Sequence, residues 1–469
     1  MERGDPGLHA EPLTLGEMVR GPAAQERLEA GGLTAPAARD GALLLARCAA
    51  MLLSGGAETD AAARAFFVPG RVEILGKHTD YCGGRSLLAA AERGFLFASL
   101  PSGGPSVTIT DARSGETDSF ALGPDLPAEP GRWPVYPRTA ARRLARNFPG
   151  ALRGARIAFA SNLPPAAGLS SSSAFLVGAH LALAAESGID ARQEYRREID
   201  GPEALAGYLA SMENGSSFGS LAGDRGVGTQ GGSEDHTAIL CSRSGTAALY
   251  SFSPVRLERR IPLGDAVVFT IAASGIAAEK TGTAMVRYNR ASRLARAAME
   301  AWNGATDSRD PHLGAILASG PGAAERLREI LSRERHGEFS TGELLDRAEH
   351  VAQESGTIVP EAAACLERGD LDGFGRWAAR SQDLGERLLR NQVPETVFLA
   401  REALRMGASG ASAFGAGFGG SVWALVPRCG AAAFLEQWQA RYAEAFPARA
   451  AGAAFFITGP SAPAFGLGR

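Results

Sequence analysis

A serine-rich run at residues 163–174 carries the side chains best suited to hold a phosphate. It reads LPPAAGLSSSSA and leads directly into an apolar helical stretch, residues 175–185. The first backbone N–H groups of a helix are unpaired and mark the positive end of its dipole. With the neighbouring hydroxyls they would form an anion site that can also reach a metal ion. An ordinary serine cap after a turn is the simpler interpretation of this run taken alone.

A second run, PGRVEILGKHTDYCGG at residues 69–84, places charged side chains between glycines. These types suit a polyhydroxylated ligand, because a carboxylate accepts hydrogen bonds from hydroxyls whereas histidine and lysine can donate. Residues 70–77 nearly match a phosphate-binding P-loop, but the spacing is one residue too long. His78 also stands where that loop requires Ser or Thr. We therefore reject a P-loop.

Two later segments complete the candidate chemistry. Glu213-Asn214 precedes a loop that ends in GTQGGSEDH at residues 228–236. The stretch GAGFGG at residues 415–420 is almost pure glycine. Glycines of this kind allow the backbone to approach a ligand or another loop closely.

Apolar periodicity and turn residues predict the elements of the first half of the chain. Residues 1–65 are predicted to be a helical lead-in. Pro69-Gly70 is expected to end a short strand that resumes two residues later. The predicted elements are strands at 66–68, 72–75, 106–110 and 156–160, a helix at 133–147, mostly helix over 174–215, and a long loop at 215–233.

The second half restarts after residue 254, so we expect a domain boundary near residues 255–265. Strands mixed with helices without a regular βαβ period predict an α+β fold. The predicted elements are strands at 266–272, 421–426 and 453–457, and helices at 281–302, 312–333, 341–354, 360–367, 370–391 and 394–406, with one more helix before the last strand.

Composition narrows the class of protein. A chain of 469 residues predicts two or three domains. Its net charge of -3 does not fit a nucleic-acid binder. Five scattered cysteines without CxxC spacing predict neither disulfides nor zinc, and the N-terminus lacks a signal-peptide layout. We expect a cytoplasmic protein with no nucleic-acid and no membrane partner.

Taken in order, the runs at 70–84, 163–174 and 415–420 resemble the three signatures of the GHMP kinase superfamily and, within it, of galactokinases. The resemblance covers roughly residues 66–460. It implies an α+β architecture of two domains, ribosomal-protein-S5-like over residues 66–260 and ferredoxin-like over 261–469. The active site would lie in the cleft between them, and residues 1–65 would precede both.

The resemblance also implies an activity. Members transfer the γ-phosphoryl group of ATP to an alcohol, here the C1 hydroxyl of a hexose, with galactose as the first candidate. Asp235 would be the catalytic base and Arg71 would lie beside the transferring phosphate; Glu234 is the rival carboxylate. The partners would be a small sugar and ATP, and the protein a monomer or weak homo-oligomer.

Individual positions carry over in the same way. Trp133 and Tyr136 match a family WxxY near the nucleotide, although core packing is the simpler interpretation. Core packing is an equal alternative for Tyr288, as is a helix-surface acid for Glu213. The implied ligand contacts are Lys77, His78, Asp80, Gly232 and Tyr288 for the sugar, Pro165, Gly168, Leu169, Ser170, Ser171, Ser172, Ser173, Gly417 and Gly419 for ATP, and Ser172 and Glu213 for Mg²⁺.

One departure bears on the substrate. Lys77 replaces the family glutamate that contacts the far end of the sugar, and Glu73 replaces an asparagine. Lys77 could pair with Glu73 or another acid, leaving galactose as substrate. Alternatively, it could face an acidic sugar such as galacturonate. Either way, a buried lysine needs a partner.

Two further hypotheses stay open at this point. A sensor that binds sugar and ATP without turnover is disfavoured by the retained Arg71, serine run and Asp235. A kinase for a non-sugar alcohol such as mevalonate is disfavoured by the HTDY element at residues 78–81.

Overall fold

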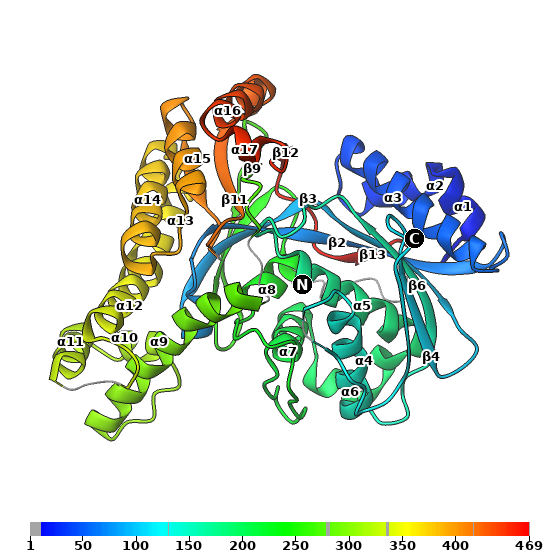
Figure 1. The fold of residues 1–469 in the computed structure, drawn as a ribbon, viewed down its shortest axis with the longest axis horizontal. Coiled ribbons are helices and arrows are strands. Elements are labelled where there is room, and N and C mark those ends of the chain that lie inside the picture. Colours follow the sequence, from blue (N-terminus) through cyan, green and yellow to red (C-terminus); the bar gives the residue numbers. More distant parts are fainter. Residues whose placement is uncertain (1–10, 130, 278–281, 334–336, 416, 469) are drawn as a thin grey trace.

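The structure is a computed structural model that describes residues 11–129, 131–277, 282–333, 337–415 and 417–468. Within these ranges the chain forms two β-sheets with helices packed around them (Figure 1). The first is a nine-stranded sheet whose main path runs β1-β2-β3-β6-β4-β5. Its strands are β1 (Leu13–Thr14), β2 (Ala62–Leu75), β3 (Arg85–Pro101), β4 (Ser106–Asp111), β5 (Thr117–Ala121), β6 (Ala155–Ser161), β7 (Thr246–Ser251), β8 (Arg256–Pro262) and β13 (Phe465–Gly466).

The central strands β2, β3 and β6 of the large sheet are buried on both faces, and alternate residues point to opposite sides. Phe66 and Phe97 pack against helix α5 (Ser171–Ser187) in the main core. Their neighbours Phe67 and Leu96 pack on the other side. There they meet the N-terminal helices α1 (Leu15–Arg20), α2 (Pro22–Ala30) and α3 (Ala35–Ser54).

Further helices lie on the α5 side of this sheet (Figure 1). Contacts between α4 and α5 and between α7 and α8 tie them together. Short 3₁₀ turns occur at η1 (Asp80–Cys82) and η2 (Ile189–Ala191). The helices are α4 (Val135–Asn147), α6 (Gln193–Glu198), α7 (Pro202–Asn214) and α8 (Glu234–Cys241).

The second sheet has four antiparallel strands in the order β10-β11-β9-β12. This is the order of a ferredoxin-like unit, which fits the expected C-terminal fold. Its strands are β9 (Val267–Ala273), β10 (Gly410–Ala413), β11 (Ser421–Pro427) and β12 (Ala454–Thr458). The helices are α9 (Gly282–Thr306), α10 (Leu313–Ala318), α11 (Ala323–Arg333), α12 (Thr341–Gln353), α13 (Val359–Glu367), α14 (Leu371–Leu384), α15 (Pro394–Arg405), α16 (Ala431–Ala445) and α17 (Pro447–Ala450).

Pro69-Gly70 does not end a strand, contrary to our expectation. Strand β2 runs through this dipeptide, and its register with β3 shifts between Pro69 and Arg71. A β-bulge accommodates a proline inside a paired strand because it releases one residue from the hydrogen-bond ladder. The same strand begins at Ala62, so residues 62–65 do not belong to a helical lead-in; residues 1–10 of that segment lie outside the described ranges.

Several predicted helix boundaries also differ. The helix expected at 312–333 is two helices, because Gly320-Pro321-Gly322 interrupts it. The gap expected between 354 and 360 is a π-helical stretch, η3 (Glu354–Ile358), and a second one, η4 (Gly385–Leu389), follows α14. Strand β13 was missed, and it returns the C-terminus to β2.

None of the helices in the described ranges is long and apolar enough to cross a membrane.

Candidate active site

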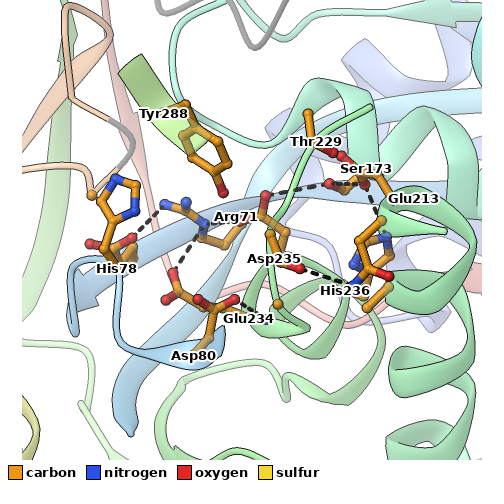
Figure 2. Close-up of a pocket in the computed structure, with 16 residues that line it drawn as sticks. Arg71, His78, Asp80, Ser173, Glu213, Thr229, Glu234, Asp235, His236 and Tyr288 are labelled. Carbon is orange, nitrogen blue, oxygen red and sulfur yellow. Dashed lines mark hydrogen bonds and ion pairs between the residues drawn. The ribbon is translucent and has the colours of Figure 1, made fainter. Parts of the chain in front are cut away.

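A pocket lined by five carboxyl side chains and one arginine lies between the two halves of the chain (Figure 2). We call it the carboxylate pocket. Most of its wall comes from the large-sheet half, while α9 and the loop before β11 supply two residues. It is lined by Arg71, Glu73, His78, Asp80, Ser173, Ala210, Glu213, Asn214, Thr229, Gly231, Gly232, Glu234, Asp235, His236, Tyr288 and Gly415.

Arg71 and Asp235 form a buried ion pair in this pocket. The Nε atom of Arg71 donates to Oδ1 of Asp235 at 2.7 Å. The bulge in β2 orients Arg71, whose backbone N–H donates to the carbonyl of Leu169 at 3.0 Å. Asp235 lies in the first turn of α8, where the helix dipole favours a negative charge. Residues 164 positions apart are thus held in one pair.

The guanidinium of Arg71 faces two more acids. Its Nη1 lies 3.4 Å from Oε2 of Glu73, and its Nε lies 3.6 Å from Oε1 of Glu234. Burial opposes the positive charge, but Asp235 and these two carboxyls outweigh it and raise the pKa of Arg71 above its ordinary value. Arg71 therefore stays charged.

The first turn of α5 joins the pocket through Ser173. Its Oγ lies 2.8 Å from Oε2 of Glu213 and 3.3 Å from Oδ2 of Asp235. Nε2 of His236 lies 3.3 Å from the same Glu213 oxygen. Glu213 is therefore a pocket residue and not a surface acid, which removes the simpler interpretation of this position.

The opposite wall of the pocket is built around Asp80. Its Oδ2 accepts the backbone N–H of Glu234 at 3.2 Å. A Cβ atom at Gly232 would lie 2.6 Å from that oxygen, so only glycine fits here. His78 has a positive φ of 55°, and its ring lies 5.1 Å from the ring of Tyr288. His78, Asp80, Gly232 and Tyr288 thus lie together, as their predicted role requires.

A second cavity of about 510 Å³ lies beside the serine-rich run. We call it the aromatic pocket, because Phe95, Trp133, Tyr136, Phe159 and Phe175 line one side of it. The other residues of its lining are Asp111, Arg113, Gly131, Arg132, Ser161, Leu163, Pro165, Ala166, Gly168, Ser170, Ser171 and Ser172.

The serine-rich run forms the boundary between the two pockets. Ser170 precedes α5 with a left-handed φ of 58°, and its buried hydroxyl has no hydrogen-bond partner within the described part of the chain. Ser171 and Ser172 line the aromatic pocket, whereas Ser173 lines the carboxylate pocket. One helix start therefore presents its unpaired N–H groups at the junction of the two pockets.

Three predicted ATP residues lie outside both linings. Leu169 is buried, and its carbonyl accepts a hydrogen bond from the backbone N–H of Arg71. Gly417 and Gly419 lie against Asn391 and Ile276, where a Cβ atom would come within 2.4 and 2.7 Å of these neighbours. Beside the glycine segment, Ser421 Oγ donates to the carbonyl of Ala167 in the serine-rich run at 2.6 Å.

Lys77 also lies outside the carboxylate pocket, contrary to our expectation. Its side chain is fully buried, and Nζ donates to Ser381 Oγ at 2.8 Å and to Ser412 Oγ at 2.7 Å. Ser381 in turn donates to Oε1 of Glu354 at 2.7 Å. Its partners are therefore hydroxyls of α14 and β10, and Glu73 instead approaches Arg71.

The oxygen donors at the junction fit Mg²⁺ as the proposed metal ion. Magnesium takes one or two protein oxygens together with phosphates and water. Glu213 offers a carboxylate, and the structure pairs it with Ser173 in place of the predicted Ser172. Ser172 faces the aromatic pocket on the other side of the same helix start. In the described ranges no group of three or more His, Cys, Asp or Glu could hold a metal by itself.

Sequence reasoning missed two parts of these pockets. Glu73 lies two residues after Arg71 on β2, so strand alternation alone could have placed both on one face. The wall formed by Phe95, Phe159 and Phe175 comes from three separate elements, and no local pattern pointed to it.

Comparisons with known proteins agree with this geometry. Three family models match the chain: "Galactokinase galactose-binding signature" at residues 56–99, "GHMP kinases N terminal domain" at 135–209, and "GHMP kinases C terminal" at 362–444. The matched segments contain β2 with Arg71, α5 with its serines, and helices α14, α15 and nearly all of α16. The chain belongs to the GHMP kinase superfamily.

Within that superfamily the protein is a galactokinase-like sugar kinase. It is 27% identical to a galactokinase of Roseiflexus sp. (strain RS-1) over 80% of this chain and 87% of the relative. It is 28% identical to a galactokinase of Chloroflexus aurantiacus over 76% of this chain and 82% of the relative.

The fold of this GHMP kinase also matches a solved relative. The crystal structure of Lactococcus lactis galactokinase complexed with galactose superposes with a TM-score of 0.69 and 21% identity, over 86% of this chain and 94% of that one. This likeness confirms the predicted α+β GHMP architecture.

Proposed function

We propose that the protein transfers the γ-phosphoryl group of ATP to the C1 hydroxyl of a hexose, with galactose as the first candidate. The observation that carries this proposal is the buried Arg71–Asp235 pair, which lies beside the junction of the carboxylate and aromatic pockets. A base next to a fixed cation suits an attacking hydroxyl next to a transferring phosphate.

Asp235 accepts the proton of the C1 hydroxyl as that oxygen forms its bond to the γ-phosphorus. The bond between the γ-phosphorus and the bridging oxygen breaks, and ADP leaves with its electron pair. Arg71 stabilises the charge on the transferring group, which is the largest contribution such a site can make. Asp80, His78 and Tyr288 hold the ring hydroxyls, and Gly232 leaves room for the sugar beside Asp80.

ATP occupies the aromatic pocket, with the base against the phenylalanines and Trp133. The unpaired N–H groups at the start of α5 and the hydroxyls of Ser170, Ser171 and Ser172 receive the phosphates. Glu213, with Ser172 or Ser173, holds Mg²⁺, which neutralises phosphate charge when bound. We expect this reaction to take place in the cytoplasm.

The acidic-sugar alternative loses its motivation, because the Lys77 ammonium is held by Ser381 and Ser412. The five carboxyls of the pocket also disfavour a negatively charged sugar by like-charge repulsion.

An ATP-coupled assay on the purified protein, with a panel of galactose, galacturonate, galactosamine and N-acetylgalactosamine, tests the proposal. We expect turnover with galactose that is lost in Asp235→Asn. Binding of sugar and ATP without turnover in the wild type would instead support a sensor, and silence towards all four sugars would overturn the proposal.

A further inference from the structure

Two buried glutamates beside Arg71 have no role in the proposed chemistry. Glu73 is 2% exposed and Glu234 is 4% exposed, and both line the carboxylate pocket. Glu73 comes from β2 and Glu234 from the start of α8. Together with Asp235 they would place three negative charges around one guanidinium, which is more than its charge can balance.

The contacts of the two carboxyls leave one oxygen on each without a donor. Ser86 Oγ donates to Oε2 of Glu234 at 2.9 Å. The Oε1 atoms of Glu73 and Glu234 are buried and accept no hydrogen bond from any donor in the described ranges. The backbone closes over the pair at Gly415, where a Cβ atom would lie 2.4 Å from Oε2 of Glu73.

The missing donor is a proton between the two side chains. Both carboxyls approach the Arg71 guanidinium, at 3.4 and 3.6 Å, and a hydrogen bond between them would satisfy both unpartnered oxygens. Two carboxyl groups can form such a bond only when one of them is protonated. Burial first, and then the charge of Glu73, raise the pKa of Glu234 well above its ordinary value, which favours a proton on this carboxyl. Oε2 of Glu73 lies 3.4 Å from Arg71 Nη1.

We propose that Glu73 and Glu234 form one carboxyl pair that shares a proton and acts as a positioning element for Arg71. The pair holds one negative charge beside Nη1 while Asp235 holds Nε. The ring of Phe414, 5.8 Å from the guanidinium carbon, covers the group from a further side. The inference rests on the proposed function, because it is Arg71 that meets the phosphate there.

The shared proton sets the charge that the phosphate encounters. With one ionised carboxyl in the pair, Arg71 is oriented but still attracts the γ-phosphate. If Glu234 also ionises, the pocket gains a negative charge. This charge weakens the attraction of Arg71 for the phosphate and itself repels the phosphate. Catalysis should therefore decline as the pH rises and Glu234 loses its proton. The groups that face Glu234 are Arg71 and Glu73 from β2, Asp80 from η1 and Ser86 from β3, and Asp235 is the next residue of its own helix.

Three variants test the pair: Glu73→Gln, Glu234→Gln and the double variant. Glutamine keeps the shape, and its amide N–H can replace the shared proton. In Glu73→Gln, Glu234 loses the repelling charge and can ionise to replace it. We therefore expect each single variant to lower kcat at most about threefold at neutral pH, so that additive losses in the double variant would reach only about tenfold. The double variant leaves Arg71 without this counter-charge, and we expect kcat to fall on the order of 100-fold.

The pH profile separates positioning from a merely structural role. The alkaline decline in kcat that we expect for the wild type should disappear in Glu234→Gln, because the amide cannot ionise. Glu186→Gln is a matched control, since Glu186 is a partly buried acid that accepts from Ser99 Oγ at 2.7 Å outside both pockets. This control should keep the wild-type profile. Thermal melts of all variants exclude loss of folding as the cause.

Additive losses in the double variant would contradict the proposal that Glu73 and Glu234 share a proton. An unchanged alkaline decline in Glu234→Gln would contradict it as well. If the wild type phosphorylates no sugar, the proposed function fails by itself. The pair is then decided by infrared spectroscopy at neutral pH: a protonated-carboxyl band that disappears in Glu234→Gln supports it, and the absence of that band in the wild type contradicts it.

Discussion

The carboxylate pocket and the aromatic pocket share the start of α5 but are built in opposite ways. The carboxylate pocket is made of charges that balance one another around Arg71, and its members come from positions 71 to 415. The aromatic pocket is made of rings and one continuous serine loop, and all its members lie between positions 95 and 175. The first selects by charge and geometry, and the second by shape and backbone donors.

Under the proposed function, different interactions would bind the two substrates in these pockets. Ring stacking and helix N–H groups tolerate changes in nearby charge, and they suit a nucleotide that many kinases share. A network of buried charges loses function when any member changes, because the partner is left uncompensated. Changes in the carboxylate pocket should therefore be costly for catalysis, and changes in the aromatic pocket mild and confined to ATP.

Removal of the base should produce the largest effect. Asp235→Asn keeps the shape beside Arg71 but removes the proton acceptor, and we expect kcat to fall about 1,000-fold. Nucleotide binding, measured by titration calorimetry, should persist. Asp118→Asn, which breaks the Arg138 pair on β5 outside both pockets, is the control. Turnover above a tenth of wild type in Asp235→Asn would contradict the assignment.

A change at Lys77 should affect stability more than substrate choice. Lys77→Glu places a carboxylate among Ser381, Ser412 and the nearby Glu354 in a fully buried site. We expect the free energy of unfolding to fall by about 3–5 kcal/mol, measured by urea denaturation. Lys77→Met, which keeps the length without the charge, should lose less. A switch of sugar preference in either variant would return Lys77 to the sugar site.

Loss of one ring should affect ATP alone. Trp133→Ala removes part of the aromatic wall, and we expect the KM for ATP to rise up to about tenfold while the KM for sugar stays the same. Trp377→Ala, on α14 and outside both pockets, is the matched control. An equal loss of sugar binding in Trp133→Ala would show that the two pockets are not separate in the way described.

The smallest effects should come from the boundary between the pockets. Ser172→Ala and Ser173→Ala differ by one position, but their hydroxyls face different pockets. We expect Ser172→Ala to raise the KM for Mg-ATP a few-fold and Ser173→Ala to lower kcat a few-fold, since a typical hydrogen bond makes a net contribution of about 0.5–1.5 kcal/mol. Steady-state kinetics with varied Mg²⁺ measures both. Identical profiles would mean that the helix start serves one pocket only.

The sequence predicted the two pockets in different ways. Consecutive residues predicted part of the aromatic pocket, whereas several motifs far apart in the chain predicted the carboxylate pocket. The serine loop and α5 could be placed from the sequence, because a helix start is written in consecutive residues. The bulge at Pro69-Gly70 could not, since its cost depends on pairing with β3. The break between α10 and α11 at Pro321 could have been predicted from the sequence, but we did not predict it.

The chain's own sequence determined which chemistry is available: a serine helix start, Arg71 on an alternating strand, and Asp235 after a glycine loop. These follow from local backbone preferences and from residue types that carry charge or hydroxyls. The tertiary structure decided which of the charged groups meet. In the folded protein, Lys77 donates hydrogen bonds to Ser381 and Ser412. Glu73 and Glu234 both lie beside Arg71. Burial makes the difference, because whether a charge is stable depends on partners hundreds of residues away.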